Sequence, residues 1–226
     1  MMKLGRSILD GIALEYPTPA VVRAALQRAI KPEHSTSPLY LYALCSLVPG
    51  KNDQIDRVVE SVVVEEMPYM VLAANMLNAL GSEPLIASLR FVACIPGQLP
   101  GGVEQHLTVH LRPFCLEQHD VLIEIEGPGD PADNQYLLNA DVNEPGIIEE
   151  FYTLIRIAWT RVDPSTFVST PRRQVGPDLR YRAVVVNDAR SAAEAIAVIV
   201  EQGEGTATSP EEVVGCGGVN DFAHFY

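Results

Sequence analysis

Apolar residues recur at steps of three and four in four parts of the chain, and this spacing predicts four helices. Their approximate bounds are 18–47, 53–80, 146–161 and 188–203. Pro32 and Pro38 fall inside the first segment, where each removes a backbone donor, so we expect that helix to be kinked or split. Asn52 or Asp53 can cap the second helix, and Gly81 is a natural stop for it.

Residues 81–145 have a different pattern, with many prolines and glycines and short alternating runs such as His106–Leu111 and Val121–Glu126. Alternation of apolar and polar residues is typical of strands. We therefore expect a long, partly extended crossover between the second and third helices, and an irregular tail at 205–226. Four helices with one long connection are the topology of ferritin-like bundles. The pattern thus predicts a mainly α, ferritin-like four-helix bundle, with residues 1–226 as a single domain.

Composition narrows the function classes. The 226 residues carry a formal net charge of −13, and Lys and Arg form no cluster beyond Arg172–Arg173, which argues against nucleic acid and anionic membranes as partners. No segment approaches the roughly 20 apolar residues of a spanning helix, and the N-terminus lacks a signal-peptide core. We therefore expect a soluble, cytoplasmic protein, and a homo-oligomer is compatible with this sequence. The scattered cysteines Cys45, Cys94, Cys115 and Cys216 favour reduced thiols.

Several glutamates lie on the apolar stripes of the expected helices. Glu33, Glu66 and Glu150 fall on the stripes of the first three, and Glu201 and Glu204 share one face near the end of the fourth. A buried carboxylate is unfavourable unless it is paired, hydrogen-bonded or bound to metal. Inward carboxylates from four helices are what a di-iron or di-manganese site requires. Alternatively, these glutamates cap helices, pair with arginines or point outward after a small rotation.

Other polar residues indicate weaker candidates. His106 and His110 are four apart, which would suit zinc on a helix, but the alternation around them favours a strand with both on its polar face. Tyr40 is most simply a core or groove residue.

Four blocks of sequence resemble a known family. VVVEEMPYMVLAANMLNALGSEP is similar to the second helix of the ferritin-like domain of iminophenylpyruvate dimer synthase and its relatives in bacterial natural-product pathways. AIKPEHSTSPLYLYALCSL, GIIEEFYTLIRIAW and AIAVIVEQGEGT resemble its first, third and fourth helices, and the closing Ala-His-Phe-Tyr resembles the start of a further segment. The resemblance implies metal-ligand roles for Glu33, Glu66, Glu150, Glu201 and Glu204, with His34 and His224 as further members of the set.

The resemblance breaks down at one candidate ligand. The family usually has histidine three residues after the second-helix glutamate, whereas this chain has Tyr69, preceded by Pro68. Phenolate binds ferric iron, but at neutral pH phenol is a poorer ligand than imidazole.

Two functional hypotheses follow. The first is a metal-dependent oxidoreductase, of the non-haem iron oxidase or oxygenase type, which acts on a small organic substrate in a biosynthetic pathway. Glu66 and Tyr69 would lie at its catalytic centre, with Tyr69 as ligand or proton donor. The second is a non-catalytic ferritin-like binding or interaction protein with a degenerate metal site. Haem, with His34 or His224 as axial ligand, is a further alternative to non-haem iron.

Overall fold

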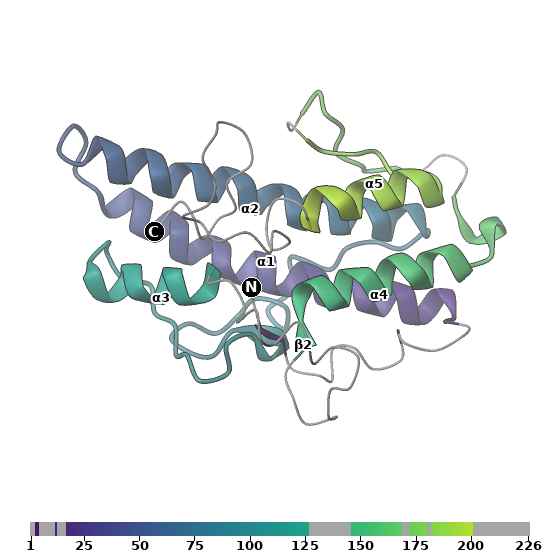
Figure 1. The fold of residues 1–226 in the computed structure, drawn as a ribbon, viewed down its shortest axis with the longest axis horizontal. Coiled ribbons are helices and arrows are strands. Elements are labelled where there is room, and N and C mark those ends of the chain that lie inside the picture. Colours follow the sequence, from purple (N-terminus) through teal and green to yellow (C-terminus); the bar gives the residue numbers. More distant parts are fainter. Residues whose placement is uncertain are drawn as a thin grey trace.

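The computed structural model is mainly helical, as the sequence predicts (Figure 1). It describes residues 3–4, 12, 17–126, 146–168, 172–179 and 182–200. The α-helices are α1 (Pro19–Ser46), α2 (Asp53–Ala79), α3 (Leu116–Glu126), α4 (Ile148–Arg161) and α5 (Ala189–Ile199). Two short 3-10 helices, η2 (Pro100–Gly102) and η4 (Pro164–Thr166), lie in connections. Strands β1 (Lys3–Leu4) and β2 (Gly146–Ile147) form one antiparallel pair, with Lys3 opposite Ile147.

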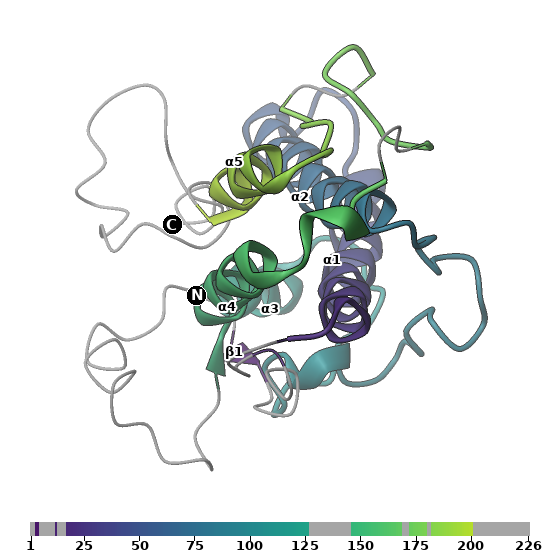
Figure 2. The ribbon, with the colours of Figure 1, turned by 90° about the vertical axis from the view of Figure 1, so that its right-hand side faces the viewer.

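Helices α1 and α2 form a long antiparallel hairpin, which is the most extensive helix pair of the structure. Helix α4 packs on α1, helix α5 packs on α2, and α4 and α5 pack on each other. These two shorter helices cover the half of the hairpin that contains the start of α1 and the end of α2 (Figure 1). Helix α3 lies almost end to end with α4 along the other half of α1 (Figures 1 and 2).

The prolines were expected to kink or split α1; the helix runs unbroken through Pro32 and Pro38, so of these two alternatives the split is wrong. The turn between the prolines is rich in hydroxyls. Ser35, Thr36 and Ser37 donate side-chain hydrogen bonds to carbonyls three or four residues earlier in the helix. These bonds do not replace the donors that the prolines lack; packing against α2 stabilises the continuous helix, and a local proline rule does not take that packing into account.

The crossover is more helical than its alternating pattern predicts. Val121–Glu126 belongs to helix α3, so the extended assignment is wrong there. A helix buries Leu122, Ile125 and Glu126 together, and six residues of alternation are too short to exclude that arrangement. Part of the crossover is extended as expected, because Val109 forms an isolated antiparallel bridge with Gly97. His106 lies in a turn, not on a strand.

Several helix ends follow local sequence rules, although Asn52, at the N-cap position of α2, makes no capping hydrogen bond through its side chain. Thr18 caps α1 through its hydroxyl, and Pro19 occupies the first turn. Gly81 has a φ of +69° just after α2, a conformation that favours glycine and explains why the helix stops there. Asp188 and Ser191 form a capping box at the start of α5. Among the helices described, none is both long and apolar enough to cross a membrane.

Candidate functional site

Two carboxylates lie deep inside the α1–α2 hairpin. Glu33 is near the middle of α1 and Glu66 is near the middle of α2, and each is only 3% exposed. The prediction that both side chains occupy buried stripes is therefore confirmed. Their roles as metal ligands stay a prediction.

Thr36 holds Glu66 from the facing helix. Its Oγ1 donates to Oε2 of Glu66 at 3.1 Å, and both residues are buried. The same hydroxyl lies 3.2 Å from the carbonyl oxygen of Glu33, within its own helix. A hydroxyl has one proton to donate, so bonding to the carboxylate competes with bonding to the backbone. Thr36 thus links the orientation of Glu66 to the turn of α1 that carries Glu33.

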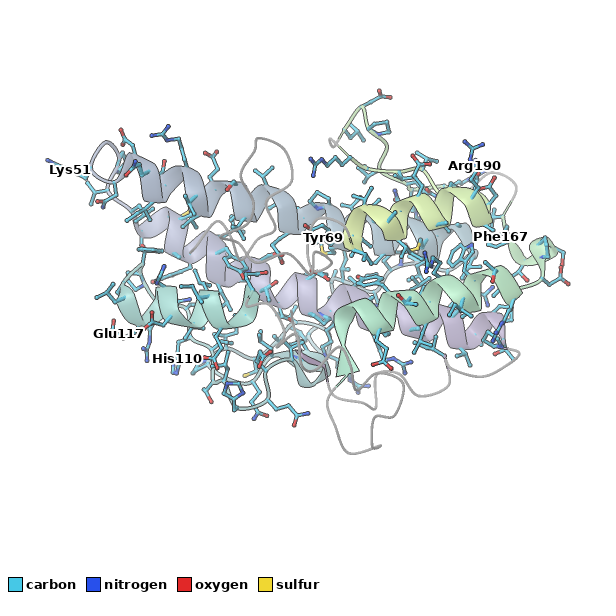
Figure 3. The ribbon with its side chains drawn as sticks, in the orientation of Figure 1. Lys51, Tyr69, His110, Glu117, Phe167 and Arg190 are labelled. Atoms are coloured by element: carbon cyan, nitrogen blue, oxygen red, sulfur yellow. The ribbon has the colours of Figure 1, made fainter. Side chains whose placement is uncertain are left out.

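Tyr69 is also buried, one helical turn after Glu66. It follows Glu66 by three residues on α2, which continues as a helix through Pro68. The phenol is 2% exposed, and Figure 3 shows Tyr69 near the middle of the molecule, beside the end of α5. The substitution of tyrosine for the expected histidine therefore places an ionisable hydroxyl, and not an imidazole, inside the bundle.

The two shorter helices also meet the middle of the hairpin. Helix α4 begins there and α5 ends there, as Figure 1 shows. Glu150, in the first turn of α4, is half-buried, and its Oε2 is fully buried. Glu201 and Glu204 would follow the end of α5, but these two residues and His224 lie outside the described residues.

His34 is placed differently from Glu33. Its ring packs edge-on against Phe91, with the ring centroids 5.1 Å apart. Its Nδ1 is buried and has no hydrogen-bond partner among the described residues. Consecutive residues of a helix point about 100° apart, so His34 and Glu33 face different surroundings. The local geometry therefore does not bring this histidine to the Glu33–Glu66 pair.

A second buried polar pair was missed by sequence reasoning. The Tyr40 hydroxyl donates to Glu126 Oε1, which joins α1 to the last residue of α3. Tyr40 is fully buried and Glu126 is 4% exposed. Tyr40 was expected in the core or in a groove. Glu126 was missed because its segment was predicted to be extended, and not helical. Because Tyr40 follows Glu33 by seven residues, it shares a face of α1 with Glu33 and Thr36.

His106 pairs with carboxylates in the crossover. Its Nδ1 lies 3.7 Å from Glu104 Oε2, and its Nε2 contacts Glu124 of α3. His106 is largely exposed, which makes this a surface pairing. The three described cysteines, Cys45, Cys94 and Cys115, are free thiols, as expected.

The donor chemistry of the interior suits iron, because carboxylate oxygens are hard ligands. Glu33 and Glu66 supply two such groups from adjacent helices. Within the described ranges, however, no three His, Cys, Asp or Glu side chains are grouped closely enough to hold a metal ion. The described residues therefore fit part of a metal site, and completing it requires ligands from elsewhere in the chain.

Comparison with known proteins agrees with this architecture. No curated protein matches the chain. A ferritin-like protein from Caulobacter vibrioides has a similar crystal structure, with a TM-score of 0.64 and 23% sequence identity. The match covers 90% of this chain and 70% of that one, and at this identity it shows the fold. The sequence model of the ferritin-like family matches residues 26–226. The chain therefore belongs to the ferritin-like family.

Proposed function

We propose that this protein binds iron at the Glu33–Glu66 pair and acts as an oxidoreductase on a small organic substrate. The supporting observation is the burial of two carboxylates, each 3% exposed, on the two most extensively packed helices. Two interior carboxylates are unfavourable in an apolar core unless protons, hydrogen bonds or a cation compensate them. Thr36 donates a hydrogen bond of this kind to Glu66.

Different residues of the chain would bind the metal, orient its ligands and transfer protons at such a site. Glu33 and Glu66 would hold the metal together with candidates from elsewhere in the chain, which are Glu150, Glu201, Glu204 and His224. Bound iron would supply the activation of dioxygen. Thr36 orients the Glu66 carboxylate, and the buried Tyr69, one helical turn after Glu66, would hold or donate a proton. The apolar core around them excludes water.

The resemblance to iminophenylpyruvate dimer synthase and its relatives supports a role in a biosynthetic pathway. It suggests a substrate derived from an amino acid or a polyketide. The resemblance rests on the blocks around Glu66 and Glu204 in particular, and Tyr69 is where this chain departs from it.

Metal content tests this proposal. Freshly purified protein, or protein loaded anaerobically with ferrous iron, should contain near-stoichiometric iron without the visible absorption band of haem. Glu66→Ala should lose the iron. Glu60→Ala, which changes an exposed glutamate on the same helix, should keep it. Equal iron in both variants would show that the metal binds elsewhere.

A non-catalytic binding protein is the second candidate, and Tyr69 favours it. A phenol replaces the imidazole ligand, and Pro68 precedes it within α2. This candidate expects negligible iron in the unaltered protein and a folded Glu66→Ala variant. Failure to bind ferrous iron under anaerobic conditions would establish it over the oxidoreductase.

A further inference from the structure

A cavity of about 590 Å³ lies against the second half of α2. Its walls are one face of α2, the segment 83–88 that follows this helix, and the segment 173–175. The lining is mainly apolar, with contributions from Met70, Val71, Ala74, Leu85, Ile86 and Val175. Small-molecule sites generally occupy about 300–1,000 Å³ and have such linings. Glu33, Glu66 and Tyr69 are not part of this lining, so the cavity is distinct from the proposed metal site.

Side-chain amides fix the walls of the cavity to the bundle. Asn75 of α2 donates to the carbonyl oxygens of Val175 and Val184 at 2.8 Å and accepts from the Val175 amide at 3.0 Å. Gln27 of α1 exchanges two hydrogen bonds with the backbone of Leu85, at 2.9 and 3.2 Å. Because the segments 83–88 and 173–175 are both anchored to long helices, the cavity is largely preformed. Binding of a ligand would therefore cost little conformational entropy in the protein.

One end of the cavity carries two opposite charges. Glu83, from the segment 83–88, pairs with Arg173, from the segment 173–175. The two side chains are 69% and 71% exposed. An ion pair that exposed contributes only about 0–1 kcal/mol, so a ligand can separate the two groups at small cost.

We propose that this cavity binds a zwitterionic α-amino acid with a large apolar side chain. The ligand's carboxylate would accept a bidentate hydrogen bond from Arg173, and its ammonium would donate to Glu83. The apolar side chain would lie against Met70, Ala74 and Val175. Charge complementarity selects this class of ligand. A simple anion would leave Glu83 without its partner, and a simple cation would do the same to Arg173, whereas a zwitterion serves both.

Calorimetric titration with L-phenylalanine and L-leucine tests the assignment. Two analogues serve as probes of the charged ends, since phenethylamine lacks the carboxylate and 3-phenylpropionate lacks the ammonium. We expect the amino acids to bind, and each analogue to bind at least tenfold more weakly than phenylalanine, since each loses one charge-assisted contact. Equal binding of phenylalanine and either analogue would overturn zwitterion recognition, as would the absence of any amino-acid binding at millimolar concentration.

Variants locate the site. Arg173→Gln and Glu83→Gln should each weaken phenylalanine binding by about tenfold, and Ala74→Phe should abolish it by placing a ring where the apolar side chain of the ligand would lie. Arg190→Gln removes an exposed cation at the start of α5, outside the lining, and should leave binding unchanged. Far-ultraviolet circular dichroism checks that each variant is folded. Binding that survives Ala74→Phe in folded protein would place the ligand elsewhere and overturn the proposal. Iron content does not enter this test, so its result is independent of the proposed oxidoreductase.

Discussion

The two ends of the bundle interior differ in chemistry. Where α4 and α5 cover the hairpin, the interior is mainly apolar, and Leu72, Met76, Ile155 and Trp159 are almost completely buried there. Towards the middle and the α3 half, the same hairpin buries carboxylates and hydroxyls, including the Thr36–Glu66 and Tyr40–Glu126 pairs. Apolar burial stabilises the fold, whereas buried carboxylates reduce that gain. The contrast assigns most of the apolar stabilisation to the covered half, and it is consistent with the site that we propose in the middle.

Removal of Trp159 should have the largest effect on stability. This side chain of α4 is 1% exposed and packs against Phe167, with the ring centroids 5.4 Å apart. Trp159→Ala should lower the free energy of unfolding by about 3–5 kcal/mol, because it removes a large apolar group and leaves a cavity. Urea denaturation followed by circular dichroism measures this change. Ile157→Ala, at an exposed position of the same helix, should have a much smaller effect.

Replacement of both central carboxylates should act in the opposite direction. We expect Glu33→Leu combined with Glu66→Leu to leave stability unchanged or raise it by about 1–4 kcal/mol, as is often found when buried charged groups give way to apolar ones. The same double variant should lose bound iron. Strong destabilisation of the metal-free protein would instead show that the carboxylates hold the bundle together, and the contrast between the two regions would then be wrong.

The Tyr40–Glu126 pair should show an intermediate effect. Tyr40→Phe removes the hydroxyl that donates to the buried Glu126, so the free energy of unfolding should fall by about 1–3 kcal/mol. Adding Glu126→Leu should recover most of that loss, because this second substitution removes the buried carboxylate that had lost its donor. A double-mutant cycle in urea measures the coupling. Independent, additive effects of the two substitutions would contradict it.

The four bundle helices were predictable because their signals are local. Apolar periodicity, the threonine before Pro19 and the glycine after α2 each act within a few residues. The burial of Glu33 and Glu66 was predictable for the same reason, since each interrupts the apolar stripe of its own helix.

The remaining features depend on contacts between distant segments. Tyr40 and Glu126 are 86 residues apart, and Asn75 bonds to Val175 across 100 residues. A local sequence pattern does not indicate such pairings. The Tyr40–Glu126 pair and the cavity on α2 could therefore be identified only from the structure. The continuity of α1 through Pro32 is of the same kind, because packing on α2 outweighs a local preference.

The smallest expected effect concerns the cap of α5, at the apolar end of the bundle. Hydrogen bonds from the Ser191 hydroxyl and amide hold the pKa of Asp188 below its ordinary value of 3.8. A lowered pKa means that the ionised cap stabilises the fold above that ordinary value and that this stabilisation is lost as the pH falls through the lower, folded-state pKa.

Asp188→Asn keeps an acceptor for the Ser191 amide but does not ionise. The unaltered protein should therefore have a slightly higher Tm than this variant at neutral pH, and the difference should shrink on acidification. Asp163 and Glu117 also have lowered pKa values, but both are present in each protein, so the difference in Tm isolates Asp188. A difference that stays constant with pH would show that the charge of Asp188 does not contribute, and that capping at this end rests on hydrogen bonding alone.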